Sequence, residues 1–552
     1  MNKKNSLLAI ITISTLLITM SAFGGIAITQ ESSNSVLVKH TYQPSNILPS
    51  GRAQMKTDTT SMKSSLLSPI SDSSDMDVQV TYSEGFDIQP TITNDDAGNL
   101  VLGYIGDPNG AGEYGVWFTS SMDQGATWPP ETSVGLTVPT PEKPSIDHWG
   151  EGHFYATMAP SSSDFDGGAF YLLDFTDVTS LYDSFNAVYW TFNDLGDGYK
   201  FFKDVSMACD NGLEDYAWGG ASIIGDYAGN EIETPMFTYQ ADEAGVAWIY
   251  TFNIEENDTY YEHGQSTSTD IDPATHLSYS VWNFENDTTG NLDIYFYSFD
   301  FGVWEEYEGY PIHPGVGEGI ISSGSDLTNI DISAQNGNIL LVAETGDEVI
   351  CYRSNDGLQT VETSVIAGSG ASYPRIIHTE DNTAVCLFTR DNNVFTSITN
   401  DGGQTWNTPV QINDEDGTVI ADEKMTDISP LGAVWTDDRI GDQNIFFDVP
   451  GVAVPIIQID SIAGGFGVSA TIINDGTADA ENIPWSITLE DGFVLLGGET
   501  TGEIPILAAG DSVTISTGLI LGFGSSTIKV SVGGAQKQTS GTVLLFFVIG
   551  VE

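Results

Sequence analysis

Seven charged side chains stand where the chain enters or leaves strand-like stretches, and together they could form a polar binding face. Aspartate offers hydrogen-bond acceptors and arginine offers a planar fork of donors, which suits recognition of a glycan, a peptide or a cation. The same residue types also satisfy the backbone of polar loops and one another, so both interpretations stay open. The candidates are Asp107, Arg375, Arg390, Asp391, Asp437, Asp438 and Arg439.

Other motifs that could carry chemistry are scarce in the chain. No set of histidines and cysteines has the spacing of zinc ligands, and the sequence contains neither Gly-x-Ser-x-Gly nor a phosphate-cradling loop. The acidic loop 413–417 could hold calcium through oxygen ligands, although it lacks the full spacing of a calcium loop. We therefore predict no catalytic residue and no cofactor, with calcium as an option.

An eight-residue motif occurs twice, as SMDQGATW at 121–128 and as TNDGGQTW at 399–406. The aspartate can accept backbone N–H groups within a turn, and the glycine can adopt positive φ. The tryptophan can then bury its ring between strands. A third copy, SNDGLQTV, starts at residue 354, 45 residues before the last, but has neither the second glycine nor the tryptophan. The motif residues are Ser121, Asp123, Gly125, Thr127, Trp128, Ser354, Asp356, Thr360, Thr399, Asp401, Gly403, Thr405 and Trp406.

A spacing of 45 residues is that of one four-stranded propeller blade. The motif resembles the Asp-box, or BNR repeat, of sialidase-like β-propellers. That resemblance implies an all-β scaffold in which the boxes lie on blade hairpins away from the ligand. The seven candidate side chains then belong to the opposite face, where the loops between second and third strands and the connections between blades lie.

The resemblance also implies an enzymatic alternative, exo-sialidase, in which three arginines hold a substrate carboxylate beside an Asp acid/base and a Tyr nucleophile paired with Glu. The chain has five arginines, Arg52, Arg353, Arg375, Arg390 and Arg439, and the first lies before the expected fold. The family's first arginine lies in an Arg-Ile-Pro motif of the opening blade, where this chain has none. We therefore expect a non-catalytic binding or surface-architecture role, with exo-sialidase-type hydrolysis as the alternative.

Short apolar alternations between Gly, Asn and Asp turns fill residues 77–450, which predicts an all-β propeller. Seven similar blade openings favour seven blades, at 90–92, 144–146, 235–237, 270–272, 330–332, 374–376 and 426–428. Six blades is the alternative, because residues 200–234 fit no blade and sialidases have six. The last blade has about three strands, and 77–82 could supply its outer strand and close the ring.

Residues 451–552 have the composition of a second unit, an immunoglobulin-like β-sandwich. Segments 474–480 and 483–487 resemble the CARDB-type modules of prokaryotic, in particular archaeal, surface proteins. The closing run 542–551 is strongly apolar, but ten residues are too few for a membrane-spanning helix. We predict that this run is the buried last strand.

The first 27 residues begin with a basic pair and continue as an apolar run, which predicts a signal peptide or an N-terminal anchor. Residues 28–76 are rich in Ser, Thr, Gln, Asn and Pro, as in a disordered spacer. The protein is therefore expected outside the cell or on its surface. Its three cysteines, Cys209, Cys351 and Cys386, are predicted as buried thiols, with a 351–386 bridge as the alternative.

The charge balance limits the partners. The chain has 77 acidic and 16 basic residues, and six of the basic ones precede residue 77, which leaves ten in the folded part. A surface this negative excludes nucleic acid and anionic membranes as partners. A glycan or a surface protein remains as a ligand, and the sequence does not indicate an oligomeric state.

Overall fold

The computed structural model describes residues 41–47, 51–52, 56–57 and, with short gaps in several connections, 77–551. All of the regular secondary structure described there is strand, apart from the four-residue helix α1 (Leu181–Ser184). None of the helices described there is long and apolar enough to cross a membrane. The predicted signal peptide or anchor, residues 1–27, lies outside the described residues.

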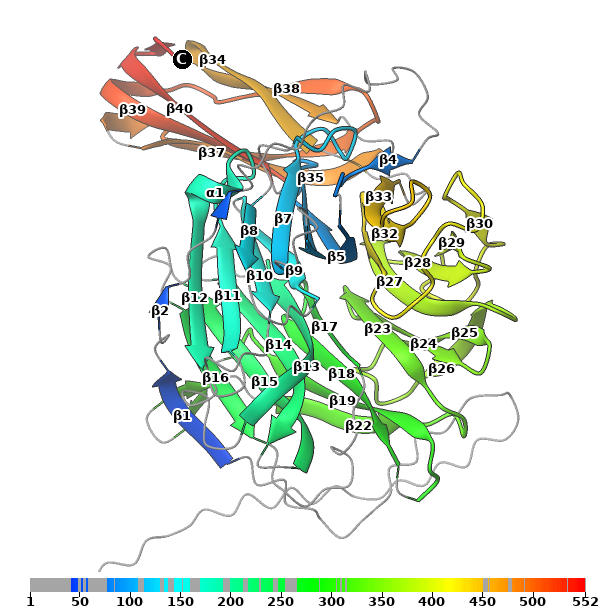
Figure 1. The fold of residues 1–552 in the computed structure, drawn as a ribbon. Coiled ribbons are helices and arrows are strands. Elements are labelled where there is room, and N and C mark those ends of the chain that lie inside the picture. Colours follow the sequence, from blue (N-terminus) through cyan, green and yellow to red (C-terminus); the bar gives the residue numbers. More distant parts are fainter. Residues whose placement is uncertain are drawn as a thin grey trace, which may run out of the picture.

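The described residues of the propeller form consecutive four-stranded sheets, the blades, each antiparallel (Figure 1). The first three are β5 (Asp87–Asn94), β6 (Leu100–Gly106), β7 (Gly115–Ser121) and β8 (Val134–Thr137); β9 (Ser145–Gly150), β10 (His153–Met158), β11 (Ala169–Phe175) and β12 (Phe185–Thr191); and β13 (Tyr199–Asp210), β14 (Ala217–Tyr227), β15 (Asn230–Ala241) and β16 (Ala247–Asn253).

The next three blades are β17 (Thr267–Asp272), β18 (Leu277–Glu285), β19 (Leu292–Asp300) and β22 (Gly315–Ile321); β23 (Thr328–Gln335), β24 (Asn338–Thr345), β25 (Glu348–Ser354) and β26 (Glu362–Ala367); and β27 (Ser372–Glu380), β28 (Thr383–Arg390), β29 (Asn393–Thr399) and β30 (Val410–Gln411). A small hairpin, β20 (Glu305–Tyr307) and β21 (Tyr310–Ile312), precedes β22. The seventh blade is β31 (Thr426–Ser429), β32 (Gly432–Asp437), β33 (Asn444–Asp448) and β4 (Val78–Gln79).

The inner strands β5, β9, β13, β17, β23, β27 and β31 adjoin one another in this order, and β31 meets β5. The ring is closed by β4, which comes from the start of the propeller and pairs with β33, Gln79 opposite Phe446. Closure removes the open sheet edges that invite aggregation. The predicted all-β propeller is confirmed, and the number of blades in the described residues agrees with the seven openings found in the sequence.

The third blade corrects one prediction. The expected opening at 235–237 lies in β15, the third strand of its blade, and the inner strand is β13, within the segment that fitted no blade. A backbone contact shows that β13 is the inner strand: the N–H of Cys209 donates to the carboxylate of Asp147 on the preceding inner strand. Such a contact leaves no local sequence pattern.

Of the predicted disordered spacer, residues 28–76, the structure describes only three short stretches, and these are strands. They are β1 (Thr41–Ile47), β2 (Gly51–Arg52) and β3 (Lys56–Thr57), which add a fifth strand to the third, second and first blades respectively. The rest of the spacer lies outside the described residues. Pairing with the outer edge of a blade uses only backbone groups, so it does not require the apolar alternation that this segment lacks.

The hydrophobic core of the propeller lies between neighbouring blades. Phe447 and Val434 of the seventh blade, for example, pack with Leu102, Tyr104 and Trp128 of the first. The three cysteines are buried thiols, as the sequence predicts, and Cys351 and Cys386 do not form the alternative bridge.

The C-terminal unit is one curled sheet with the order β37-β35-β39-β40-β41-β34-β38, in which β36 also pairs with β39. Because β34 also lies against β35 and β39, which are not its neighbours in the sheet, the sheet folds into two packed layers around an apolar core. The strands are β34 (Ile457–Asn474), β35 (Ala480–Glu490), β36 (Phe493–Leu496), β37 (Glu499–Leu507), β38 (Ser512–Ser516), β39 (Leu521–Val532), β40 (Ala535–Leu545) and β41 (Phe547–Ile549). The predicted sandwich is confirmed.

One detail of this unit was predicted wrongly. In the closing run 542–551, Val543 and Val548 are buried, but Leu544, Phe547 and Ile549 are about half exposed. Alternate side chains of a strand point to opposite faces, so a continuous apolar run is buried only where both faces are covered. Here the outward face is uncovered.

Candidate functional site

Each of the three box motifs forms its own local hydrogen-bond network, and the three networks have the same contacts. In the first, Ser121 Oγ accepts the N–H of Gly125 at 2.9 Å, and Asp123 accepts both the N–H of Thr127 at 2.8 Å and its hydroxyl at 2.6 Å. The motifs starting at Ser354 and Thr399 repeat each of these contacts. The copy at 354 is therefore a complete turn despite its altered sequence.

The altered copy replaces the second glycine by leucine. Leu358 has φ 62°, close to the values of Gly125 (86°) and Gly403 (82°). A non-glycine residue in this conformation is strained, and the network of Ser354 and Asp356 together with complete burial of the Leu358 side chain holds it there.

The tryptophans of the other two motifs face neighbouring blades. Trp128 is 8% exposed, and its ring packs edge-on against Phe447 of the seventh blade, with centroids 5.7 Å apart. Trp406 is half-buried and donates from Nε1 to Ser364 Oγ of the fifth blade at 3.0 Å. These contacts give the motifs a structural role between blades.

The candidate binding site is a cavity of about 460 Å³ on the propeller axis. All seven inner strands contribute to its lining, which is rich in Ser, Thr and Asp side chains. Neither Phe, Tyr nor Trp occurs among the described residues that line it. Its polar groups are therefore hydrogen-bonding groups without an aromatic platform.

Aspartates in this lining bond the blades to one another. Neighbouring inner strands do not pair as a sheet, so their N–H groups need another acceptor. At five junctions between blades, a carboxylate on one inner strand accepts an N–H from the inner strand of the next blade at 2.7–3.0 Å. The pairs are Asp147 with Cys209, Asp204 with Thr267, Asp270 with Ala334, Asp331 with Ile376 and Asp427 with Ile92. We call these five carboxylates the axial ring.

Burial shifts the pKa values of several axial groups. It raises the pKa of Asp147 to about 6 and that of Asp270 to about 8, against the lowering effect of the N–H groups that they accept. Burial likewise raises the pKa of Asp331, which Arg375 partly offsets. The ring therefore carries less negative charge at neutral pH than five carboxylates would.

Three of the ten cations in the folded part converge on the same cavity. Lys143 Nζ lies 3.8 Å from Asp427, and Lys424 Nζ lies 2.8 Å from Asp204 across the channel. Lys143 Nζ and Arg375 Nε both point to the carbonyl oxygen of Thr426, at 3.5 and 3.4 Å. Burial lowers the pKa of Lys143 to about 8, although Asp427 raises it.

Two buried histidines belong to the lining as well. Burial lowers the pKa of His148 and of His378 to about 4, so both are neutral at pH 7. His378 Nδ1 lies 2.9 Å from Ser333 Oγ, whereas Nε2 of each ring has no hydrogen-bond partner among the described residues. A buried polar atom of this kind costs free energy unless a water or a ligand meets it.

Of the seven sequence-predicted ligand residues, only Arg375 lines the cavity. Arg390 lies over the Phe395 ring, 4.3 Å from its centroid, and Asp391 forms a tight turn with φ 52°. Asp107 is buried, and its N–H is bonded to the carbonyl oxygen of Phe86. The N–H of Asp438 is bonded to the carbonyl oxygen of Thr418. The structure does not bring these residues together at one site.

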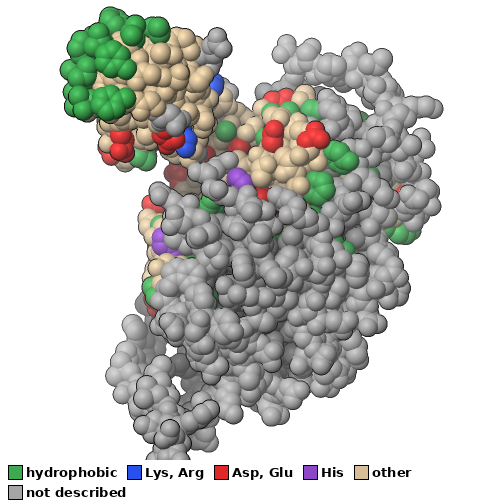
Figure 2. Space-filling model, turned by 90° about the vertical axis from the view of Figure 1, so that its left-hand side faces the viewer, with side chains coloured by type: hydrophobic (Ala, Val, Ile, Leu, Met, Phe, Trp, Pro, Cys, Tyr) green, Lys and Arg blue, Asp and Glu red, His purple; other side chains and the backbone are tan. Residues whose placement is uncertain are grey.

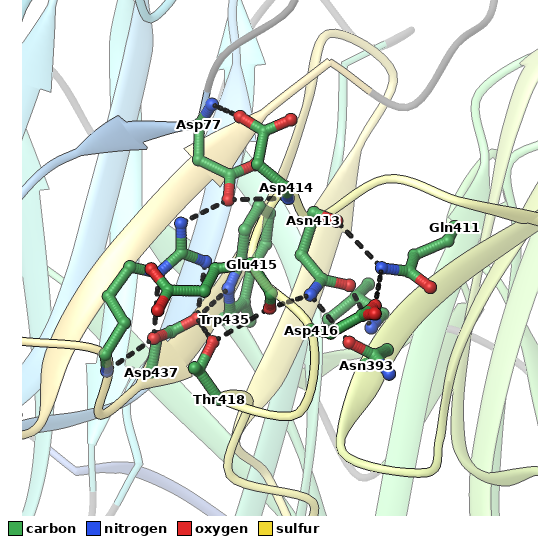
Figure 3. A network of polar contacts seen from close by, with 12 residues as sticks. Asp77, Asn393, Gln411, Asn413, Asp414, Glu415, Asp416, Thr418, Trp435 and Asp437 are labelled. Atoms are coloured by element: carbon green, nitrogen blue, oxygen red, sulfur yellow. Dashed lines mark hydrogen bonds and ion pairs between the residues drawn. The ribbon is translucent and has the colours of Figure 1, made fainter.

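Asp437 lies beside Asp77 and Asp414 at the ring closure (Figure 3), and Arg439 pairs with both Asp437 and Asp77. The guanidinium of Arg439 lies 2.6 Å from Asp437 and 2.5 Å from Asp77, which directly precedes β4. Asp77 in turn exchanges two backbone-to-carboxylate hydrogen bonds with Asp414, at 2.8 and 3.0 Å. The loop considered for calcium thus binds the closing strand, and no cluster of potential metal ligands is found among the described residues.

The positions of the arginines test whether the cavity could hold a substrate carboxylate as the sialidase alternative requires. Of the four arginines whose side chains are described, only Arg375 lines the cavity, while Arg353 pairs with Glu362, Arg390 packs on aromatic rings and Arg439 belongs to the closure. Three arginines therefore do not converge on a substrate carboxylate within the described residues.

Sequence reasoning missed most of the axial site, namely Lys143, Asp147, Asp204, Asp270, Asp331, Lys424 and Asp427. A signal was present: blade openings such as 270–272, 330–332 and 426–428 contain Asp next to Ile. Since the isoleucine faces the core between blades, strand alternation turns the aspartate toward the axis.

Comparisons with known proteins add the following. No family model matches the chain, and no curated protein matches it. Among solved structures, a protein of unknown function from Dyadobacter fermentans has a TM-score of 0.41 at 10% identity, covering 68% of this chain and 98% of its own. A Hadza microbial sialidase has a TM-score of 0.37 at 12% identity, covering 68% of this chain and 68% of its own. A GH93 α-L-arabinofuranosidase of Fusarium graminearum has 0.37 at 10% identity, covering 61% and 97%. At these TM-scores the neighbours carry no argument about activity.

Proposed function

We propose that the protein is a non-catalytic binding protein of the cell surface or the extracellular space, and that its axial cavity holds a neutral, hydroxyl-rich ligand such as the terminal sugar of a glycan. The cavity offers closely spaced hydroxyls, carboxylates, amines and neutral imidazoles, which can donate to and accept from sugar hydroxyls. The surface location rests on the N-terminal sequence.

One observation carries the choice of a neutral ligand: the cavity cations already have oxygen partners. Lys143 and Lys424 face Asp427 and Asp204, and Arg375 faces a carbonyl oxygen. At Lys143 or Lys424, an anionic ligand would compete with the buried carboxylate that already faces the lysine, and a carboxylate displaced in this way is a costly unpaired charge. A neutral ligand can instead share the hydrogen bonds of these pairs.

The test is a glycan-array screen of the full chain with and without calcium, followed by calorimetric titration of a neutral glycan that binds. Lys424→Met should weaken binding about tenfold or more, since it removes a charged hydrogen-bonding group from the cavity. Lys529→Met is the matched control, because Lys529 is exposed and pairs with the exposed Glu490 in the C-terminal unit. That variant should bind as the wild type does.

A sialidase assay on the same preparations tests the alternative. We expect no release of sialic acid from model glycosides. Robust turnover that is lost in Arg375→Ala would overturn the proposal, as would an array on which only sialylated glycans bind.

A further inference from the structure

One end of the C-terminal unit carries large apolar side chains that the other described residues leave exposed. Figure 2 shows hydrophobic side chains gathered at this end. Each is between 37% and 66% exposed: Phe466, Phe493, Leu495, Leu496, Leu519, Phe523, Leu544, Leu545, Phe546, Phe547 and Ile549. We call this surface the apolar cap. Soluble proteins rarely expose so large a contiguous group of such side chains unless it binds something.

Along the strands, the outward side chains change from polar to apolar toward the cap. On β40 the outward positions are Gln536, Gln538, Ser540 and Thr542, and then Leu544. On β39, which pairs with β40, Lys529 lies opposite Gln538 and Phe523 lies opposite Leu544. The boundary therefore lies at a similar level on adjacent strands, as at the edge of an apolar layer.

The cap includes both sides of the curled sheet. Phe493 on β36 lies opposite Phe523 on β39, whereas Phe466 on β34 lies opposite Phe547 on β41, with ring centroids 5.7 Å apart. Apolar side chains thus surround the end of the unit. A flat protein partner covers one side of such an end, while a fluid apolar medium covers all of it.

The cap carries no charge. The segments that form it, 463–471, 493–498, 518–526 and 539–551, contain no Asp, Glu, Lys, Arg or His. Attraction to anionic headgroups therefore has no local source, and the net charge of −61 repels an anionic surface.

We propose that the apolar cap inserts into the outer hydrocarbon region of a lipid bilayer with uncharged or zwitterionic headgroups. Insertion removes phenylalanine and leucine side chains from water, which is favourable roughly in proportion to the apolar area buried. The polar outward residues behind the cap then lie at headgroup level. This docking is independent of the axial cavity.

The test is flotation of the full chain with phosphatidylcholine vesicles. The wild type should float with the vesicles, and Phe493→Ser and Leu495→Ser should each lower the partition coefficient about tenfold, the loss expected for one buried apolar side chain. Both residues are about two-thirds exposed, so neither variant should lower the melting temperature. Val410→Ser is the matched control, an equally exposed apolar residue on β30 of the propeller, and should float as the wild type does.

Sedimentation of the lipid-free protein tests whether a second copy of the chain, rather than lipid, covers the apolar cap. The proposal is overturned if the wild type does not float, or if Phe493→Ser floats as well as the wild type. It is equally overturned if the protein self-associates without lipid, loses this association in Phe493→Ser and does not bind vesicles, because a second copy then covers the cap.

Discussion

Asp331 Oδ2 accepts the N–H of Ile376, on the inner strand of the next blade, at 2.8 Å. Arg375, which precedes Ile376, makes the next contact between blades with donor and acceptor exchanged: here the side chain donates and a backbone carbonyl oxygen accepts. Its guanidinium lies 3.4 Å from the carbonyl oxygen of Thr426 on the seventh blade. Blades of this propeller are thus joined along the axis by side chains that meet backbone groups, with carboxylates as acceptors at five of the contacts.

Removing one carboxylate of the axial ring should destabilise the propeller. Asp331→Ala leaves the N–H of Ile376 without its acceptor, and a buried unsatisfied donor costs about 1–3 kcal/mol. Asp331→Asn keeps an oxygen acceptor in place and should cost less. Chemical denaturation of both variants measures the difference, and equal losses would show that the hydrogen bond to Ile376 is not the source.

The ring closure should depend on Arg439. Arg439→Met leaves Asp77 and Asp437, both almost fully buried, without their cation, and breaking a buried ion pair in this way costs about 3–5 kcal/mol. Arg353→Met is the control, because its partner Glu362 is 70% exposed and such pairs contribute about 1 kcal/mol or less.

Denaturant unfolding decides between these two arginines. A loss for Arg439→Met no larger than that for Arg353→Met would mean that the pairing of β4 with β33 closes the ring without the cluster at Asp77.

The sequence predicts the repeated parts of this fold well. Alternating strands, box turns and the closing strand at 77–82 follow from local patterns, because side-chain alternation and turn chemistry act over a few residues. The third blade and the axial ring depend on contacts between inner strands that are 45 to 335 residues apart in sequence, such as that of Asp147 with Cys209. The Asp next to Ile in several blade openings indicates an aspartate at the axis, but it does not encode which backbone N–H that aspartate meets. The prediction that residues 542–551 form a buried strand was wrong for a different reason. Apolar composition predicts burial, but it does not show whether another part of the protein covers both faces of the strand.

The two tryptophans of the box motifs should differ in their effect on stability. Trp128→Ala removes an almost fully buried ring that packs on Phe447, and truncation of such an aromatic costs about 3–5 kcal/mol. Trp406 is only half-buried, so Trp406→Ala should cost less, chiefly the contact with Ser364. Melting temperatures rank the two variants. Neither should change glycan affinity, and a specific loss of binding in either would contradict the structural role of the motifs.

The stability of the propeller should fall as the pH rises from 6.5 to 7.5, and Asp270 should be the cause. Burial raises the pKa of Asp270 to about 8 in the folded protein, whereas an unfolded aspartate has a pKa of about 3.9. Between these values the folded state holds more protons than the unfolded state, so its stability decreases with rising pH, by at most about 1.4 kcal/mol per pH unit.

Comparison with a variant that does not titrate isolates this group. His148 and His378, with pKa values lowered to about 4, act with the opposite sign: because the unfolded pKa is about 6.5, their contribution still rises with pH at the lower end of the window. Asp147, with its pKa raised to about 6, acts in the same direction as Asp270 but mainly below the window. Lys143, with its pKa lowered to about 8, acts mainly above pH 8 and with the opposite sign. Melting temperatures at constant ionic strength should therefore decline more steeply across the window for the wild type than for Asp270→Asn, which keeps an acceptor for Ala334 but does not titrate. Parallel slopes for the two proteins would assign the pH response to a group other than Asp270.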